Sequence, residues 1–386
     1  MRFLHTADWH IGRQFHNVSL LEDQRHVLGQ LINVIQKEKV EAVIIAGDVY
    51  DRSVPPSEAV DLLDETLHTI VHDLGVPVIV IAGNHDGGVR LGFGSRQLMQ
   101  AGLHITGPLS DAILPIELKD EHGSIFVYTI PYIDPATVRD VFHNDVQNFD
   151  EAMIFITDQI KSYHAREHPK CRSILVTHCF LAGGESSDSE RPLSVGGADQ
   201  VSIDQFLEFN YTALGHLHQP QYKGAEHIRY SGSLLKYSFS EVEKPKSLTL
   251  IDMNAGGDCN INEVPLNPIR DMRVIEGKLE AILKAGKKDS ANQDYLLVRL
   301  LDKHAILDPM GKLRSVYPNV LHLEKSNLTI RADSESLDYD ALKMNRLQLF
   351  EDFYKQMVDE DLDAGQRAHI TTLIDDIEKD DGGVAS

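Results

Sequence analysis

Residues 76–86 read VPVIVIAGNHD, a short apolar run that ends in a cluster of polar side chains. The run over 76–82 is rich in β-branched residues and short for a helix, so it predicts a buried β-strand. Gly83-Asn84-His85-Asp86 follows it directly and carries groups that ligate metals or transfer protons. The stretch therefore predicts a strand that delivers a functional loop at its carboxyl end.

Four other apolar runs end in the same way. We predict buried strands at 2–6, 42–46, 173–177 and 212–214, and they lead into Asp8-Trp9-His10, Gly47-Asp48, Thr177-His178 and Gly215-His216-Leu217-His218. In open α/β sheets the functional crevice lies beyond the carboxyl ends of the strands, so we expect the five motifs to converge there. Glycines directly before Asp48, Asn84 and His216 let the chain turn sharply and approach a bound ion.

Amphipathic segments lie between these strands. Helical periodicity extends over 21–36 and 58–74, and Pro55-Pro56-Ser57 is a start signal for the second helix. Further strands are predicted at 228–241 and 247–252. Helices and strands that interleave in this way predict an α/β layered sandwich.

A different pattern begins after a loop at 254–258 (NAGGD). Strands at 272–275, 295–300 and 320–323 alternate with helices at 279–285 and 312–317, which predicts a compact second α/β domain. Two helical faces follow, the first formed by Leu347, Phe350, Phe353, Tyr354 and Met357, the second by Ile370, Leu373, Ile374 and Ile377. We therefore divide the chain into 1–255, 256–340 and 341–386, with a disordered end.

Bulk composition restricts the class of protein. The chain has 386 residues, and no apolar run approaches the length that spans a bilayer. Its three cysteines form no CxxC pair, which fits a reducing cytoplasm. The net charge of -22 argues against a stand-alone, tight DNA binder, although it does not speak against a basic partner subunit.

The polar residues of the five motifs make up a candidate metal site. Its candidate ligands are Asp8, His10, Asp48, Asn84, His178, His216 and His218. Carboxylate, amide and imidazole groups form a mixed O/N set that suits manganese, iron or zinc, and the lack of thiolate argues against a structural zinc. One bridging carboxylate would hold two cations roughly 3.5–4 Å apart, the separation used in two-metal phosphoryl chemistry.

Two further residues next to this site have a predicted role in catalysis. His85 lies one residue beyond a candidate ligand, so it is placed to protonate or stabilise a leaving oxygen. Asp86 would orient His85 as its hydrogen-bond partner. Such a site would deliver a metal-activated water to phosphorus, so the residues predict phosphoester hydrolysis.

Each motif has an ordinary alternative when it is taken singly. Asp8 and His10 would be a surface pair, His178 a hydrogen-bonded core histidine, and 83–86 a plain turn. Five such motifs at successive strand ends favour a single site instead. Trp9 is left open between a wall of the cleft and ordinary core. His5, His68, His72, His104 and His122 are interpreted as surface or core residues without a role.

With these residues in place, the first 220 or so residues resemble the calcineurin-like metallophosphoesterase superfamily. Within it, nearly the whole chain resembles the SbcD family of nuclease subunits. The segments that carry this narrower resemblance are 5–12 (HTADWHIG), 191–201 (RPLSVGGADQV), 230–241 (YSGSLLKYSFSE), 317–321 (YPNVL) and the 349–354 helix.

The resemblance implies an αββα metallophosphoesterase sandwich at 1–255, a capping domain at 256–340 and partner-binding helices at 341–386. It implies a nuclease that acts as a 3′→5′ exonuclease on duplex DNA and as an endonuclease on single strands and hairpins, in repair, recombination and replication. Two divalent ions, Mn²⁺ by preference, would be its cofactors. One would be held by Asp8, His10, Asp48 and His218, the other by Asp48, Asn84, His178 and His216, with His85 as the catalytic histidine.

The family works as a homodimer within a heterotetramer, bound to an SbcC-type ATPase. The chain has no GxxxxGK[ST] phosphate loop, so any dependence on ATP has to come from such a partner. The helices at 341–386 would bind its coiled coil or pack on their own domain. The helices at 21–36 and 58–74 would form a homodimer bundle or cover the sheet.

Two other functions compete with a nuclease. Residues 47–52 (GDVYDR) superficially resemble the Gly-Asp-x-x-Asp-Arg motif of protein phosphatases, but Ser53 follows where a glycine would stand, and Asp86 replaces a glutamate. A non-catalytic scaffold of the same fold usually loses ligands, and none is missing here.

Asp51 stands where archaeal and eukaryotic relatives have a histidine, so the role of that histidine is not transferred.

Overall fold

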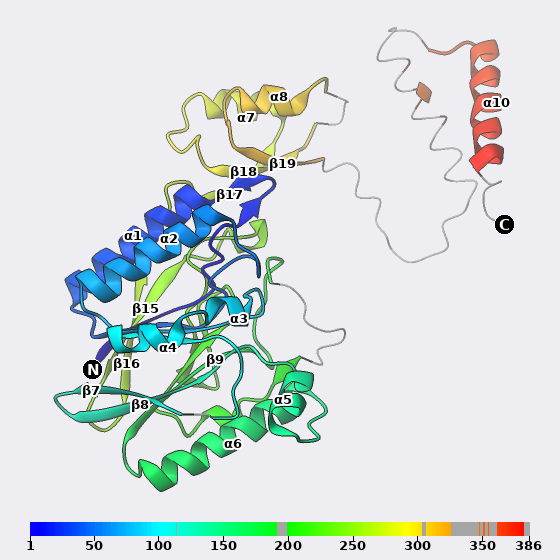
Figure 1. The fold of residues 1–386 in the computed structure, drawn as a ribbon. Helices are drawn as coiled ribbons and strands as arrows, with labels where there is room; N and C mark the ends of the chain where they lie inside the picture. Colours follow the sequence, from blue (N-terminus) through cyan, green and yellow to red (C-terminus); the bar gives the residue numbers. More distant parts are fainter. Residues whose placement is uncertain are drawn as a thin grey trace. The chain divides into compact units, whose positions relative to one another are not determined.

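The computed structural model describes residues 1–112, 114–190, 199–302, 306–325 and 361–381, together with 347, 350, 351 and 354. The chain divides into two units, 1–326 and 327–386, which are described separately (Figure 1). In the described part of the chain, no helix is both long and apolar enough to cross a membrane.

Within the described residues of the first unit, two six-stranded sheets form the centre of the fold. The first has the order β16 (Cys259–Pro265), β15 (Ser247–Met253), β1 (Arg2–Thr6), β4 (Ala42–Ile45), β5 (Val78–Ile81), β6 (Leu103–Thr106). The second has the order β13 (Gln221–Lys223), β14 (Ala225–Tyr230), β12 (Tyr211–Gly215), β9 (Arg172–His178), β8 (Gly123–Ile130), β7 (Ile116–Asp120). The strands β1, β4, β5 and β6 run parallel, as do β14, β12, β9 and β8.

The central strands β4, β5, β9 and β12 are buried on both faces, which explains why they are largely apolar runs. In β4, Val43 and Ile45 pack in the cluster with the helices α1 (Leu21–Glu38) and α2 (Ser57–His68). Ala42 and Ile44, on the other face of the same strand, pack between the two sheets. Because successive side chains of a strand point to opposite faces of the sheet, β4 contributes to two hydrophobic cores.

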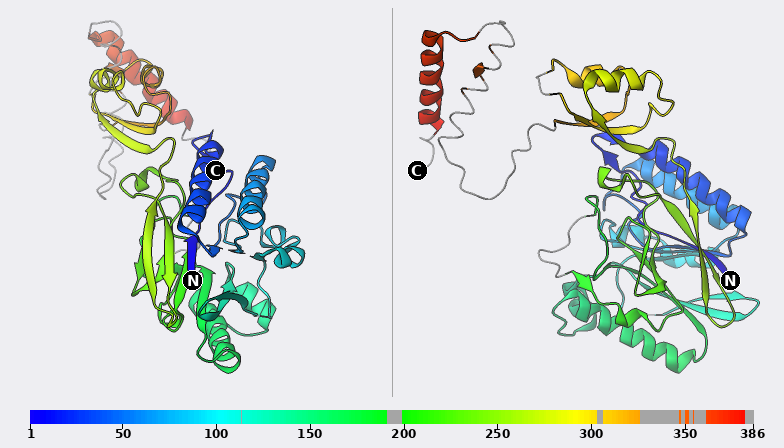
Figure 2. Two further views of the ribbon diagram at one scale, coloured as in Figure 1. Left: turned by 90° about the vertical axis from the view of Figure 1, so that its left-hand side faces the viewer. Right: turned by 180° about the vertical axis from the view of Figure 1, so that it is seen from behind.

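Helices cover the outer faces of both sheets. The helices α1 and α2 lie side by side on the first sheet, as Figure 2 shows from two further sides. The second sheet packs against α6 (Phe149–Glu167) and α5 (Pro135–Phe142). This order of layers confirms the predicted αββα sandwich.

A smaller sheet follows in the same unit. In the described chain it has three parallel strands, β17 (Met272–Gly277), β18 (Tyr295–Leu300) and β19 (Val320–Lys325). The helices α7 (Leu279–Gly286) and α8 (Pro309–Arg314) share a hydrophobic cluster with it. Met272 and Tyr295 instead pack into the cluster that contains α1, which attaches this sheet to the sandwich.

Shorter elements complete the described chain. They are β2 (Gln14–Phe15), β3 (Val18–Ser19), the π-helical turn Thr69–Asp73, α3 (Gly88–Leu91), α4 (Ser95–Leu98), the 3-10 turns Met99–Ala101, Asp204–Phe206 and Phe239–Glu241, β10 (Phe180–Leu181) and β11 (Gln200–Val201). In the second unit, the helix α10 (Ala364–Asp381) includes residues 370–377, where a helix was predicted. Phe353 and Met357 of the other predicted face lie outside the described residues, as does 382–386 of the predicted disordered end.

Among the differences from the predicted elements, two lie between residues 228 and 265. The predicted strand at 228–241 was wrong beyond Tyr230, because Leu234, Leu235 and Tyr237 are buried as parts of an irregular segment. The strand β16 was not predicted, and it pairs with β15 in the first sheet. The division of the chain at 255 and 340 stays a prediction.

Candidate metal centre

The five predicted motifs meet at one edge of the sandwich. Three of them follow β1, β4 and β5, which are neighbours in the first sheet. The other two stand at the ends of β9 and β12, which are neighbours in the second sheet. All these strands end at the same edge, so the loops bring together side chains that are up to 210 residues apart, from Asp8 to His218.

The backbone of this edge is strained at four of the seven candidate ligands. The φ angles of Asp8, His10, Asp48 and His216 are 53°, 45°, 49° and 107°. Non-glycine residues in this region typically cost about 1–3 kcal/mol and persist only where the surroundings enforce them. Here the amide of Asp8 donates to the Gly47 carbonyl at 3.0 Å, and that of His10 donates to the Asp48 carbonyl at 2.9 Å. The two loops therefore hold each other in the strained conformation.

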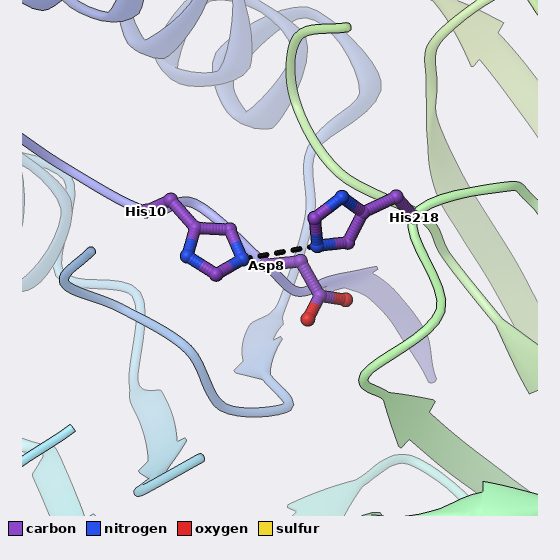
Figure 3. Close-up of side chains that lie close together, drawn as sticks. All are labelled: Asp8, His10 and His218. Atoms are coloured by element: carbon purple, nitrogen blue, oxygen red, sulfur yellow. Dashed lines mark hydrogen bonds between the residues drawn. The ribbon is translucent and has the colours of Figure 1, made fainter. Parts of the chain in front are cut away.

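Asp8, His10 and His218 form the first cluster of candidate ligands, and all three side chains are buried (Figure 3). The Nε2 atoms of His10 and His218 face each other at 3.0 Å. Both oxygens of Asp8 accept from the His216 amide, at 3.0 and 3.2 Å, which fixes the carboxylate. Two ring nitrogens beside a carboxylate are a suitable donor set for a divalent cation.

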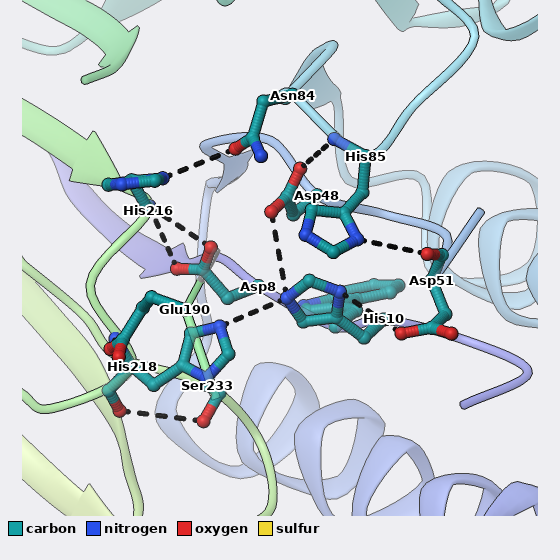
Figure 4. A network of polar contacts seen from close by, with 12 residues as sticks. Asp8, His10, Asp48, Asp51, Asn84, His85, Glu190, His216, His218 and Ser233 are labelled. Carbon is teal, nitrogen blue, oxygen red and sulfur yellow. Dashed lines mark hydrogen bonds and ion pairs between the residues drawn. The ribbon is translucent and has the colours of Figure 1, made fainter. Parts of the chain in front are cut away.

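Asn84, His178 and His216 form a second cluster beside the first. Figure 4 shows two of its members, Asn84 and His216. The amide oxygen of Asn84 lies 2.9 Å from His178 Nε2 and 3.2 Å from His216 Nδ1. Asp48 Oδ2 lies 3.6 Å from His178 Nε2 and also 3.6 Å from His10 Nε2. The carboxylate of Asp48 thus stands between the two clusters.

The proton positions favour a cation at the second cluster. The Nδ1 of His178 lies 2.9 Å from the carbonyl oxygen of Ala46, which can only accept, so Nδ1 carries the hydrogen. The lone pair of His178 Nε2 then faces the amide oxygen of Asn84, which is also an acceptor. Two acceptors this close repel each other unless a positive charge lies next to both. The residues present therefore fit a divalent metal ion.

Burial sets the charge state of the side chains. It raises the pKa of Asp8 well above its ordinary value, and the neighbouring Asp48 adds to this. It lowers the pKa of His10 and of His216 well below the ordinary value, with further contributions from the neighbouring His218 and His178 respectively. Neutral imidazole is the form that binds metals, so these histidines are already in the binding form at neutral pH.

His85 lies next to both clusters and is only 5 % exposed. Its amide donates to Asp48 Oδ1 at 2.8 Å, and its Nδ1 donates to the carbonyl oxygen of Asp51 at 2.9 Å. The carbonyl fixes the hydrogen on Nδ1, so Nε2 is the nitrogen available to a substrate. Figure 4 shows the ring between Asp48 and Asp51.

Asp86 is placed differently from its predicted position. Its carboxylate accepts hydrogen bonds from the amides of Val49 at 3.1 Å, Tyr50 at 2.9 Å and Gly83 at 2.9 Å. These bonds tie the loop after β4 to the loop after β5, while Asp51 supplies the partner of His85. Burial raises the pKa of Asp86 to about 7, and the neighbouring Asp48 adds to this.

Gln24 on α1 is a buried residue of the site that the sequence did not reveal. Its Nε2 donates to the carbonyls of His10 at 2.7 Å and Trp9 at 3.2 Å, and its Oε1 accepts from the Gly12 amide at 3.0 Å. A polar residue on an amphipathic helix gives no signal of such a role. Trp9 proves to be core: it is fully buried, and its indole nitrogen donates to Thr6 Oγ1.

Comparisons with known proteins place the chain in a family. A profile of the calcineurin-like phosphoesterase family matches residues 1–220, and one of the type 5 capsule protein repressor C-terminal domain matches 268–358. The SbcD subunit of the nuclease SbcCD from Staphylococcus epidermidis is 36 % identical over 375 residues, 97 % of this chain and 98 % of that one. Its counterpart from Staphylococcus saprophyticus is 31 % identical over 379 residues, 97 % of this chain and 98 % of that one.

Solved structures are more distant. A dimetal phosphatase from Danio rerio is 11 % identical with a TM-score of 0.40, covering 65 % of this chain and 92 % of that one. The profile covers more than half of this chain, and the two staphylococcal sequences extend along nearly all of it. The chain therefore belongs to the calcineurin-like phosphoesterase family, among its SbcD nuclease subunits, and is a metal-dependent phosphodiester hydrolase.

Proposed function

We propose that this chain is a two-metal DNA nuclease, a 3′→5′ exonuclease on duplex DNA and an endonuclease on single strands and hairpins. The position of Asp48 carries the proposal: its Oδ2 lies 3.6 Å from His10 Nε2 in one cluster and 3.6 Å from His178 Nε2 in the other. A carboxylate between two clusters of ligands is positioned to bridge two metal ions. The staphylococcal relatives are named as parts of the nuclease SbcCD, which supports DNA as the substrate.

The seven side chains would divide between two divalent ions, with Mn²⁺ as the preferred metal. Asp8, His10 and His218 would hold one, Asn84, His178 and His216 the other, and Asp48 both. When bound, the ions would neutralise the phosphodiester and lower the pKa of an attacking water. His85 would then stabilise or protonate the leaving oxygen through Nε2, since Asp51 holds its Nδ1.

Arg13 is a candidate contact for the DNA backbone. Its guanidinium donates to Asp51 Oδ1 at 2.9 Å and lies 5.2 Å from the ring centre of Tyr237. Among the described residues, its buried Nε has no hydrogen-bond partner. A cation fixed beside the site in this way attracts a phosphate, although the net charge of -22 opposes long-range attraction of DNA.

We further propose that the chain acts in the cytoplasm together with an SbcC-type ATPase. The relatives are named as subunits of a complex, which supports such a partner. In the second unit, α10 exposes Leu373 by 45 %, as expected for a helix that docks into the groove of a partner.

A homodimer would use the surface formed by α2 and α3. The inner faces of α1 and α2 cover the first sheet, so they are already occupied. Next to them, Val60, Val89 and Phe93 are exposed by 42, 81 and 86 %. Exposed apolar side chains are typical of interaction surfaces where they form a patch. We expect Phe93→Asp to shift the mass measured by light scattering from dimer to monomer, with metal content unchanged; an unchanged mass would contradict this interface.

A nuclease assay tests the proposed activity. Hairpin DNA and end-labelled blunt duplex are incubated with Mn²⁺ or Mg²⁺, with and without the SbcC-type ATPase and ATP, and Asp48→Ala serves as the inactive control. We expect nicked hairpins and 3′→5′ shortening, faster with Mn²⁺. A phosphopeptide is tested in parallel. Phosphate released from the peptide, with the DNA left intact, would overturn the proposal in favour of a protein phosphatase.

A further inference from the structure

A chain of hydrogen bonds lies behind His218, on the side away from the metal centre. The Nδ1 of His218 lies 2.6 Å from Ser189 Oγ, which in turn donates to Glu241 Oε1 at 2.5 Å. The other oxygen of Glu241, Oε2, forms an ion pair with Lys246 Nζ at 2.6 Å. We call Ser189, Glu241 and Lys246 the relay. It belongs to segments, 187–190 and 230–246, that have no other role in the proposed chemistry.

The relay is almost completely buried. Ser189, Glu241 and Lys246 are 7, 1 and 5 % exposed. The ion pair with Lys246 keeps the Glu241 carboxylate ionised. Lys246 also donates to the His218 carbonyl at 2.7 Å and to Ser233 Oγ at 2.9 Å. A buried ion pair contributes little net stability by itself.

The direction of the hydrogen bonds follows from this arrangement. An ionised carboxylate can only accept, so the single hydrogen of Ser189 Oγ points to Glu241. The oxygen of Ser189 is then left as an acceptor, and the hydrogen in its bond with His218 has to come from Nδ1. His218 is therefore the Nδ1–H tautomer, and the lone pair of its Nε2 faces His10 and the metal centre.

The relay also anchors the segment 187–190 to His218. Glu190 Oε1 accepts from the His218 amide at 2.7 Å. Ser187 Oγ lies 2.7 Å from Glu190 Oε2 and 3.0 Å from Glu241 Oε1. The side chain, amide and carbonyl of His218 are thus all held by partners from 187–190 and 246. Such contacts orient a ligand, since they fix both its tautomer and its ring plane.

We propose that Ser189, Glu241 and Lys246 are positioning residues that hold His218 as the Nδ1–H tautomer with Nε2 directed at the metal centre. The proposal rests on the proposed function in one respect, the role of His218 as a metal ligand. If the relay served only to stabilise the fold, removal of the Ser189 hydroxyl would leave the tautomer of His218 and the affinity for metal unchanged. The two roles can therefore be separated.

The tautomer is measured first, in metal-free protein with ¹⁵N-labelled histidine, by the chemical shifts of the ring nitrogens. We expect His218 to be Nδ1–H in the parent chain and to lose this preference in Ser189→Ala, while Ser189→Thr, which keeps the hydroxyl, restores it. Ser240→Ala is the matched control, because Ser240 Oγ accepts from the Asp188 amide in the same region. An unchanged tautomer in Ser189→Ala would overturn the proposal.

The second measurement is a Mn²⁺ titration of the same variants, followed by electron paramagnetic resonance. Loss of such a partner typically weakens a metal site roughly 10–100-fold. In Ser189→Ala we expect this loss of affinity at one of the two Mn²⁺ sites, with the affinity of the other site and the circular dichroism spectrum unchanged. The Ser240→Ala variant should bind Mn²⁺ with the same affinities as the parent. Equal affinities in Ser189→Ala and the parent would contradict the proposal. No Mn²⁺ binding by the parent would instead contradict the proposed function and leave the tautomer result as the test of the relay.

Discussion

The carboxylate of Asp48 stands between the two clusters of candidate ligands. Its Oδ1 accepts from the His85 amide at 2.8 Å, and its Oδ2 lies between His10 and His178. The strained φ of 49° directs the side chain into the centre, and Gly47 before it, with φ 92°, leaves room for His178. A Cβ on Gly47 would lie 2.4 Å from His178 Nδ1, so only glycine fits there.

His85→Ala and Asp48→Ala should separate proton transfer from metal binding. His85 would act on the leaving oxygen, so its loss should lower kcat roughly 10²–10⁴-fold while both metals are retained. Loss of Asp48 should remove the metals, because the bridging ligand is gone. Metal content by mass spectrometry and hydrolysis of a phosphodiester check this. DNA cleavage by His85→Ala at the parental rate would show that the acid has been assigned incorrectly.

Among single residues, the sequence predicted those whose side chains commonly bind metals or transfer protons. The seven candidate ligands and His85 come together at one edge, although their roles as ligands stay a prediction. The sequence did not indicate Gln24, because Gln24 binds backbone groups. It did not indicate Ser189 or Glu241 either, because these two act on His218 through the Ser189 hydroxyl. Their contacts are 12 to 213 residues apart along the chain, and nothing in their local pattern marks them.

Among the elements, the strands of the two sheets were the most predictable. Burial on both faces makes β4 and β5 continuous apolar runs, and the polar motifs after them mark where they end. The segment after Tyr230 misled the prediction because its apolar residues are buried without a strand partner. The strands β6, β7 and β8 and the helices α5 and α6 were not predicted, since no functional motif follows them.

Asp86→Asn tests how the loops after β4 and β5 are held. An amide has a single acceptor oxygen, so it cannot accept from Val49, Tyr50 and Gly83 in the same geometry. We expect the metal concentration for half-maximal activity to rise roughly 10–100-fold, with a smaller effect on kcat at saturating metal than in His85→Ala. A loss of kcat equal to that of His85→Ala, at unchanged metal affinity, would instead support the predicted role of orienting His85.

His5 makes the stability of β1 dependent on pH. The ring is fully buried, with Nδ1 2.9 Å from Tyr211 Oη, and burial lowers its pKa to about 3. Below an unfolded-state pKa of about 6.5, the unfolded chain binds a proton that the folded chain does not, so stability falls as the pH falls. The effect is about 1.4 kcal/mol per pH unit, or about 2 kcal/mol at pH 5.

Urea unfolding at pH 7.5 and pH 5 would measure this contribution by comparison with His5→Gln. The glutamine does not titrate, so acidification should shift the difference in unfolding free energy by about 2 kcal/mol in favour of the variant. A difference that is the same at both pH values would show that His5 takes up its proton in the folded state.

For the whole molecule, the two units should have separable functions. The seven candidate ligands lie in the first unit, whereas α10 lies in the second. Deletion of residues 340–386 should therefore abolish binding to the SbcC-type ATPase in a pull-down and spare Mn²⁺-dependent cleavage of short single strands. Binding retained by the truncated chain would contradict a partner-binding role for the C-terminal helices.

Anomalous diffraction from crystals grown with Mn²⁺ would test the metal centre most directly. We expect two peaks roughly 3.5–4 Å apart, one beside Asp8, His10 and His218, the other beside Asn84, His178 and His216, with Asp48 in contact with both. A single peak, or peaks away from Asp48, would contradict a two-metal centre.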